Sequence, residues 1–318
     1  MKDLRIAAAF LVVFGMSFPG FAEDKAAVAP SSAAPDKPVM MDEVYPGLAS
    51  AVLTCARLVD LPEGTLLRAG ELVIKASRVS EQIDQAPKPV QTQLRKNALF
   101  VLEQIATREL LLMEATAHAA KAGTDVTESS ERDIMEKYFR ALVEKTAVTD
   151  REVAEFFRDN SEMFQGAGLD DVRPQLKQYL LQQKQTEAVN LHVRTLGQRV
   201  RIELSAAWVR TQAVQAMDNP VDRARRSGRP SLVDFGRGGC GPCDMMTPLL
   251  EQLTEKYGGK ANVLFVHVGE QPILAARYGI RSIPEQVFFD KDGREVFRHT
   301  GFFPKDKIEK KLSEMGVK

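Results

Sequence analysis

Cysteine, histidine and tryptophan are scarce in this chain, which has three, four and one of them among 318 residues. Three cysteines are too few for a disulfide scaffold in a chain of this length. A structural zinc site needs four ligands, yet Cys55 is the only cysteine besides Cys240 and Cys243, and no histidine shows a paired spacing with it. Zinc is therefore disfavoured, and no metal is expected.

Excess charge and long apolar segments are also lacking. Lys plus Arg equals Asp plus Glu at 43 each, so the composition gives no reason to expect nucleic acid or an anionic membrane surface as a partner. Beyond the N-terminus no segment approaches the roughly 18 uninterrupted apolar residues that a membrane-spanning helix requires. The mature chain is expected to be soluble.

The N-terminus carries an apolar run of ten residues, AAAFLVVFGM, after Lys2 and Arg5. The run is too short for a permanent membrane span, and the small residues Gly20 and Ala22 stand where a signal peptidase reads the chain. Residues 1–22 are therefore predicted to be a signal peptide cleaved after Ala22, with an uncleaved anchor as the alternative. No cysteine follows the run directly, so a lipid anchor is not expected.

Residues 23–47 are rich in Ala, Pro, Ser and charge without periodicity, which predicts a flexible linker. Order is expected from Leu48, in a mainly helical unit that extends to residue 210. Alternation at Leu72 and Ile74, after a turn at Gly70, predicts a short strand in this unit. Apolar residues at helical spacing and a capping box of Thr149 and Glu152 predict its helices, over 90–121 with a glycine C-cap, from Thr127, from Thr149, and over about 172–197.

The segments AGELVIKASRV, LEQIATRELLLMEATAHAAKAG, TDREVAEFFRDNSEMF and the closing RVRIELS follow one another within about residues 48–207. This order resembles the N-terminal chaperone domain of periplasmic foldases of the SurA and PpiD type. In those foldases a parvulin-type prolyl isomerase domain follows the segment that matches EFFRDNSEMF. Here only residues 165–169 stand before the closing helix. The resemblance therefore implies a periplasmic chaperone unit without isomerase activity.

From residue 211 to residue 318 the pattern changes to alternating strands and helices. Lys291 to Gly293 between two apolar runs predict a hairpin. Alternation followed by a hairpin predicts a mixed α/β sheet flanked by helices, so the chain is expected to be multidomain, with a helical unit followed by an α/β unit. The predicted strands are PSLVDFG, NVLFVHV, QVFFD and EVFRHTG, and the predicted helices lie over about 213–227, 241–257, PILAARYG and 305–315.

The pair Cys240 and Cys243 stands at the predicted start of the helix over 241–257. Unsatisfied backbone N–H groups and the positive end of the helix dipole favour the thiolate of Cys240 there. Pro242 has a preset φ for the first turn and no N–H that would lack a partner. Cys243 is then placed to attack a mixed disulfide on Cys240, so that the pair can cycle between dithiol and disulfide. A structural disulfide is the alternative, although so small a loop stabilises little.

The stretches LVDFGRGGCGPCDMMTPLLEQLTEKY and ARYGIRSIPEQVFFDKDGREVFRHTGF closely resemble thioredoxin over about residues 213–318. The resemblance implies a thioredoxin fold whose redox-active disulfide, Cys240 with Cys243, serves in place of a bound cofactor. It implies that Pro284 is the cis-proline of a peptide-binding loop. It further implies that Asp234 is the buried acid that accepts the proton of Cys243. Substrate contacts are implied for Gly241, Pro242, Ile283 and Pro284.

Several residues depart from the thioredoxin pattern. Gly236 and Gly239 replace the two tryptophans that usually flank the motif, so the surface around the pair should be less aromatic. Phe265 stands where many thioredoxins have a buried lysine, which would favour the neutral form of the nearby acid. Asp244 and Glu285 should surround the site with negative charge.

These features predict an exported thiol-disulfide oxidoreductase of the periplasm, reducing or isomerising disulfides in secreted or envelope proteins. The Gly-Pro dipeptide of the motif and Ile283 are similar to reducing members of the family, and a periplasmic reductase implies a membrane thiol reductant of the DsbD type as a partner. The alternative is a chaperone or assembly factor that binds unfolded chains and uses the thioredoxin unit for docking. Cys55 is predicted to be a small buried apolar residue, with a regulatory or intermolecular thiol as the alternative.

Overall fold

The computed structural model describes residues 38–123, 126, 129–164 and 166–318. The predicted signal peptide and residues 23–37 of the predicted linker lie outside these ranges. Within the described residues, no helix has both the length and the apolar composition needed to cross a membrane.

A small sheet joins the first and last segments of the helical region. The strand predicted at Leu72 and Ile74 is β3 (Leu72–Lys75), which forms a hairpin with β2 (Thr65–Ala69) across the turn at Gly70. β4 (Glu203–Ser205) pairs with β2 on one side and with β1 (Arg57–Val59) on the other. Because β4 follows the last long helix, its pairing places the end of the helical region beside the first strands of that region.

The helices of this region differ from the prediction at Asn97. The helix expected over 90–121 is interrupted at Asn97, which has φ −115° and ψ 37° and lies between α3 and α4. α5 follows its N-cap residue Ser130, whose side chain accepts a hydrogen bond from the Asp133 N–H; the predicted start at Thr127 lies outside the described residues. The capping box of Thr149 and Glu152 is confirmed. The helices are α2 (Ala76–Asp84), α3 (Lys88–Lys96), α4 (Ala98–Lys121), α5 (Glu131–Val143), α6 (Asp150–Asp159), a 3₁₀ turn (Ser161–Phe164), α7 (Leu169–Arg199) and α8 (Ala206–Ala216).

Order begins earlier than the predicted start at Leu48. Met41, in the short helix α1 (Met41–Val44), is fully buried and belongs to the apolar core of the helical region. Its N–H donates to the Ala56 carbonyl at 2.8 Å. Residues 39–47 are therefore part of the folded unit, because burial of a large apolar side chain fixes a segment whose composition predicts a linker.

The predicted domain boundary between residues 210 and 211 falls inside α8. Val209, Ala213 and Ala216, on successive turns of α8, all pack into the core of the helical region. The α/β region therefore begins after Ala216, with α9 (Pro220–Arg225) in place of the single helix expected over 213–227. Residues 39–318 form one compact unit by their contacts.

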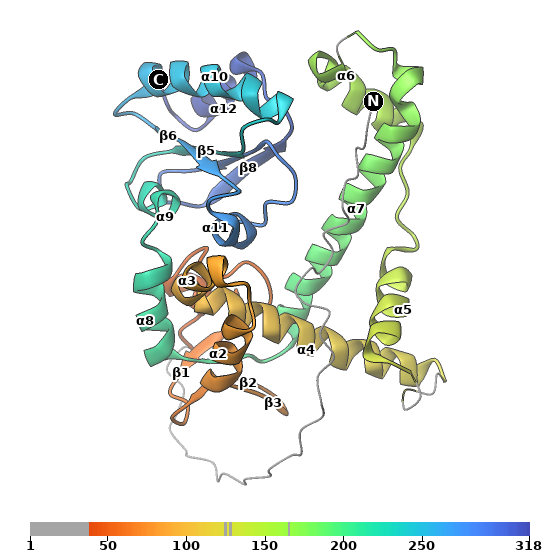
Figure 1. The fold of residues 1–318 in the computed structure, drawn as a ribbon, viewed down its shortest axis with the longest axis vertical. Coiled ribbons are helices and arrows are strands. Elements are labelled where there is room, and N and C mark those ends of the chain that lie inside the picture. The colour runs from red at the N-terminus through yellow and green to blue at the C-terminus, as the bar shows by residue number, and fades with distance from the viewer. Residues whose placement is uncertain (1–37, 124–125, 127–128, 165) are drawn as a thin grey trace. The chain divides into compact units, whose positions relative to one another are not determined.

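The α/β region is built on a sheet with the strand order β6-β5-β7-β8 (Figure 1). β5 is parallel to β6 and antiparallel to β7, and β7 and β8 form the predicted hairpin. Helices α10 and α12 cover one face of the sheet, and α9 and α11 cover the other (Figure 1). The elements are β5 (Ser231–Gly236), α10 (Gly241–Tyr257), β6 (Asn262–His267), α11 (Pro272–Arg277), β7 (Glu285–Phe289), β8 (Glu295–Thr300) and α12 (Lys305–Glu314).

The strand β5 has no exposed residue, since both faces of the sheet are covered. Leu232 packs with the side chains of α10 and α12, whereas Val233 and Phe235 belong to the cluster on the α11 side. This arrangement follows from the alternation of side chains along a strand. It also brings the end of β5 to the start of α10, where Cys240 lies.

A buried network of charged and polar side chains joins the α/β region to the helical region. The carboxylate of Asp222 accepts hydrogen bonds from Arg277 and from the Tyr278 hydroxyl, and it pairs with Arg225 at 3.3 Å. Arg277 also donates to the Ala216 carbonyl at the end of α8 (2.7 Å), and Arg225 donates to the carbonyls of Gly293 (2.8 Å) and Pro46 (3.3 Å). The side chain of Asp222 is only 1% exposed, so its charge is balanced by protein groups.

Candidate active site

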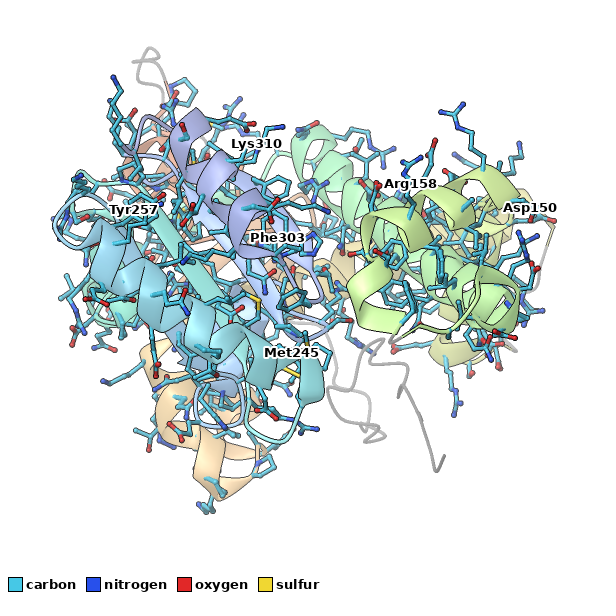
Figure 2. All side chains as sticks on the ribbon, turned by 90° about the horizontal axis from the view of Figure 1, so that it is seen from above. Asp150, Arg158, Met245, Tyr257, Phe303 and Lys310 are labelled. Atoms are coloured by element: carbon cyan, nitrogen blue, oxygen red, sulfur yellow. A yellow bond between two sulfur atoms is a disulfide. The ribbon has the colours of Figure 1, made fainter. Side chains whose placement is uncertain are left out.

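Cys240 and Cys243 form a disulfide at the N-terminus of α10, with their Cα atoms 5.2 Å apart. Cys240 is the N-cap residue, and its carbonyl accepts the first helical hydrogen bond from the Asp244 N–H (2.9 Å). Cys240 is half-buried, whereas Cys243 is 2% exposed. A partner from solution therefore meets Cys240 first. Figure 2 shows α10 with Met245 near its start and Tyr257 near its end.

Gly236 and Gly239, which precede the cysteine pair, differ in what would oppose a larger side chain at each position. Gly239 has φ +74°, a left-handed conformation that side chains with a Cβ rarely adopt. A Cβ at Gly236 would lie 3.0 Å from Cε2 of Phe265, so the phenyl ring already occupies the space beside this glycine. Phe265 is nevertheless 49% exposed. The surface beside the pair thus retains an aromatic group, supplied by the edge strand β6.

The loop before β7 lies against the disulfide. The Ile283–Pro284 peptide bond is cis, and the Ile283 carbonyl oxygen lies 4.0 Å from Sγ of Cys240. The Pro284 carbonyl accepts a hydrogen bond from the Gly301 N–H at 2.8 Å, which ties the loop to the end of β8. The structure therefore brings the predicted substrate-contact residues Ile283 and Pro284 beside Cys240, with Gly241 and Pro242 in the first turn of α10.

Asp234 lies in the middle of β5 and is fully buried. Burial raises the pKa of its carboxyl to about 6, and one hydrogen bond from Gln286 opposes this increase. The Gln286 amide donates to Oδ1 of Asp234 at 2.7 Å. On the other side, Asp234 stands opposite Phe265 of β6 in the strand register, so this position supplies no cation, as predicted. Gln286 is the residue that sequence reasoning missed.

The two acids predicted to surround the site differ in their environments. Asp244 is exposed in the first turn of α10. Glu285 is instead only 5% exposed and accepts a hydrogen bond from Arg298 at 2.7 Å. Burial raises the pKa of the Glu285 carboxyl, while the Arg298 guanidinium opposes that shift. The negative charge that Glu285 was predicted to add beside Pro284 is therefore balanced by Arg298, which reaches it from β8.

Outside the Cys240–Cys243 pair, the remaining candidates for redox or metal chemistry are Cys55 and clusters of metal-binding side chains. Cys55 is a half-buried free thiol and not the buried core residue predicted. Among the described residues, no group of three or more His, Cys, Asp or Glu side chains is arranged to hold a metal ion.

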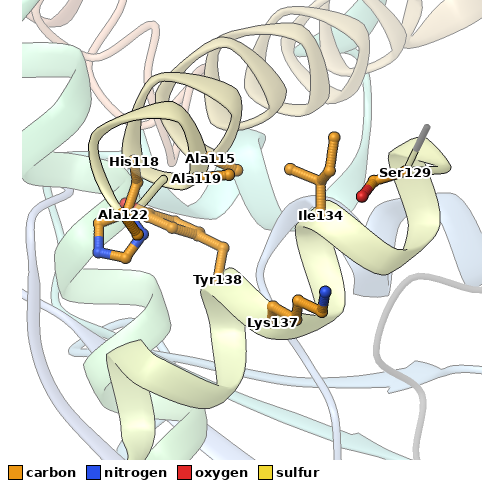
Figure 3. A pocket seen from close by; sticks show the side chains of 8 residues that line it. All are labelled: Ala115, His118, Ala119, Ala122, Ser129, Ile134, Lys137 and Tyr138. Carbon is orange, nitrogen blue, oxygen red and sulfur yellow. The ribbon is translucent and has the colours of Figure 1, made fainter. Parts of the chain in front are cut away.

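A hollow between α4 and α5 has a volume of about 130 Å³, with His118 and Tyr138 facing each other from the two helices (Figure 3). Sites for small molecules typically measure about 300–1,000 Å³. The volume of this hollow lies below that range. Its lining residues are Ala115, His118, Ala119, Ala122, Ser129, Ile134, Lys137 and Tyr138.

The raised pKa of Asp234 implies that the stability of the folded chain depends on pH. The carboxyl titrates at about 6 in the folded chain and at about 4 when unfolded, so the folded state binds the proton more tightly. Its contribution to stability is present below about pH 4 and is lost as the pH rises through about 6. Asparagine does not titrate, so Asp234→Asn should be more favourable at high pH. We expect the change in the free energy of unfolding that this substitution causes to be about 2 kcal/mol more stabilising at pH 8 than at pH 4. Urea unfolding at the two pH values measures this difference; a pH-independent effect would contradict the raised pKa.

A sheet covered by helices on both faces, with a Cys-Gly-Pro-Cys disulfide at a helix N-terminus and a cis-proline loop beside it, defines a dithiol protein of the thioredoxin fold. Residues 217–316 match the family described as a thioredoxin-like domain. A thioredoxin of Staphylococcus epidermidis is 42% identical over 101 residues, which are 32% of this chain and 95% of the relative. A thioredoxin of Chlorobaculum thiosulfatiphilum is 44% identical over 88 residues, 28% of this chain and 81% of that relative.

Two solved thioredoxin structures are also similar to part of this chain. A thioredoxin from Nicotiana alata has 28% identity and a TM-score of 0.27, covering 30% of this chain and 80% of that one. A mutant thioredoxin from Halobacterium salinarum has 31% identity and a TM-score of 0.28, covering 31% of this chain and 83% of that one. By its curated relatives, the chain belongs to the thioredoxin family, whose general chemistry is thiol-disulfide oxidoreduction.

Proposed function

We propose that this chain is an exported thiol-disulfide oxidoreductase that reduces or isomerises disulfides in secreted or envelope proteins of the periplasm. The observation that carries the proposal is the asymmetry of the pair, in which Cys240 is accessible and Cys243 is buried behind it. The Pro284 loop beside Cys240 and the buried Asp234 support the same chemistry.

The proposed cycle uses these residues in order. The Cys240 thiolate attacks one sulfur of a substrate disulfide, that S–S bond breaks, and the leaving sulfur takes a proton. Cys243 gives its proton to the Asp234 carboxylate and attacks Sγ of Cys240. The mixed disulfide breaks, the second substrate sulfur leaves as a thiolate and takes up a proton, and the Cys240–Cys243 disulfide forms. Two electrons have passed to the substrate.

The proposed direction is reduction, because the Gly241-Pro242 dipeptide and Ile283 are similar to reducing thioredoxins, whose potential is about −270 mV. Each turnover leaves Cys240 and Cys243 oxidised, so an external dithiol must return two electrons. We propose a membrane thiol reductant of the DsbD type as that partner. Signal-peptide cleavage after Ala22 would place the chain in the same compartment.

We propose that the helical region, which resembles a SurA-type chaperone domain, binds unfolded polypeptide. Large apolar side chains on its long helices support this role, since Met113 of α4 is 48% exposed and Leu191 of α7 is 57% exposed. The same observation favours the second candidate function, a chaperone in which the thioredoxin unit only docks partners. Suppression of aggregation of a cysteine-free unfolded protein measures this binding without any redox step.

A trapping experiment tests the oxidoreductase proposal. In a Cys55→Ser background, Cys243→Ser should form a mixed disulfide with insulin that survives denaturation and is released by dithiothreitol, because no thiol remains to resolve it. Cys55→Ser with both Cys240→Ser and Cys243→Ser is the matched control and should capture nothing. Equal capture by the trap and the control, or none by either, would overturn the assignment of Cys240 as the attacking thiol.

A further inference from the structure

Gln286 is a fully buried polar residue at a position where an apolar side chain would be ordinary. It lies on β7, a central strand whose five residues are all buried. Strands covered on both faces are usually apolar throughout, and burying an amide is costly unless it forms hydrogen bonds. Its Nε2 donates to Asp234 at 2.7 Å, whereas its Oε1 finds no partner among the described residues. The Asp234 contact is therefore the interaction that offsets the burial of this amide.

The strand register holds the two side chains together. Asp234 and Gln286 are direct cross-strand partners in the antiparallel pair β5 and β7. Side chains opposite each other in such a pair have Cβ atoms about 5 Å apart, so a glutamine can reach the carboxylate without leaving its own strand. Both residues are 0% exposed. Solvent therefore does not compete for this hydrogen bond.

The second carboxylate oxygen faces the redox pair. Oδ2 of Asp234 has no hydrogen-bond partner among the described residues. This oxygen and Cβ of Cys243 each lie 3.5 Å from the position that a Cβ at Gly236 would occupy, and Cε2 of Phe265 lies 3.0 Å from it. The unpartnered oxygen and the resolving cysteine thus border the same small space, with the Phe265 ring as its third wall.

We propose that Gln286 is a positioning residue for thiol-disulfide exchange, in which its amide fixes Oδ1 of Asp234 so that Oδ2 is directed toward Cys243. This inference rests on the proposed function. In the resolving step the Cys243 proton passes to Oδ2, the Cys243 sulfur attacks Sγ of Cys240, and the substrate thiolate leaves with the electron pair of the mixed disulfide. Gln286 gives up no proton in this step. It holds the acceptor in place and favours its charged form by donating a hydrogen bond.

Gln286→Met tests the proposal, because methionine keeps the length of the side chain and removes the amide. Stopped-flow reaction of the reduced chain with 5,5′-dithiobis(2-nitrobenzoate), in a Cys55→Ser background, releases one thiolate when Cys240 attacks and a second when Cys243 resolves. We expect the pH midpoint of the second phase to rise by about 1 unit, since a hydrogen bond to the charged carboxylate is lost. Near pH 6 the second phase should slow several-fold, while the first phase should be unchanged.

Val287→Ala is the control for a merely structural effect, because Val287 is buried on the same strand but belongs to the cluster on the α11 side. It should lower stability and leave both midpoints in place. In an Asp234→Asn background, Gln286→Met should have no further effect on the second phase. If Gln286→Met does not fold, Gln286→Asn, whose shorter amide cannot reach Oδ1, is measured in the same way.

A readout independent of activity separates this proposal from the proposed function. ¹³C NMR titration of the Asp234 carboxyl should show a higher pKa in Gln286→Met than in the parent, whether or not the chain reduces any protein disulfide. An Asp234 pKa and a second-phase midpoint that both stay within about 0.2 units of the parent would overturn the positioning role. Failure of the insulin trap with a shifted Asp234 titration would instead overturn the proposed function alone.

Discussion

A Cys240→Ser chain is expected to reduce insulin disulfides no faster than dithiothreitol does alone. A serine oxygen cannot form the mixed disulfide, and the remaining thiol of the pair, Cys243, is 2% exposed and cannot meet a protein substrate directly. The measurement is the turbidity of insulin in the presence of dithiothreitol. Cys55→Ser is the matched control and should keep full activity, since Cys55 is outside the disulfide.

The same variant separates the two candidate functions. If the helical region binds unfolded chains, Cys240→Ser should suppress aggregation as well as the parent does while its reductase activity is lost. Substantial insulin reduction by Cys240→Ser would contradict the assignment of the attacking thiol. Full complementation of a deletion strain by this variant would show that the chaperone function, and not redox chemistry, accounts for the biological role.

Asp222→Asn is expected to lower stability by about 3–5 kcal/mol, because it leaves the guanidinium groups of Arg225 and Arg277 buried without their carboxylate. For a unit of this size the loss corresponds to a decrease in apparent Tm of about 10 °C. Thermal unfolding followed by circular dichroism measures the change.

Asp218→Asn is the matched control for this loss. The Asp218 side chain is 66% exposed and pairs with Arg223 at 2.7 Å on the surface, so its removal should cost less than about 1 kcal/mol. Equal effects of the two variants would mean that the buried network contributes no more than an exposed ion pair does.

Much of the α/β region could be predicted from the sequence because its signals are local. Strand-like runs, the turn at Gly293 and the helix start at Cys240 each depend on a few neighbouring residues, and the observed strands agree with them. The resemblance to thioredoxin predicted the positions of Asp234 and Pro284 from equally local sequence motifs. These are positions where family pattern and local pattern agree.

The missed features depend on contacts between residues far apart in the sequence. Gln286 contacts Asp234 across a strand pair, and a single glutamine in a strand-like run does not reveal which residue will be its partner. Glu285 was expected to add negative charge around the site, but Arg298 reaches it from the neighbouring strand. Met41 was assigned to a linker because composition carries no information on which single side chain the core will bury. These contacts become visible only when the three-dimensional structure shows which distant residues lie side by side.

The network around Asp222 also determines where this chain can be divided. A fragment that begins at Met217, at the first residue of the family match, would contain Arg277 without the Ala216 carbonyl and Arg225 without the Pro46 carbonyl. Each missing acceptor would leave an N–H donor of a buried guanidinium open to solvent or unsatisfied. The thioredoxin region is therefore not an interchangeable module: transplanting it onto another protein would require replacing the arginines that the helical region has made necessary.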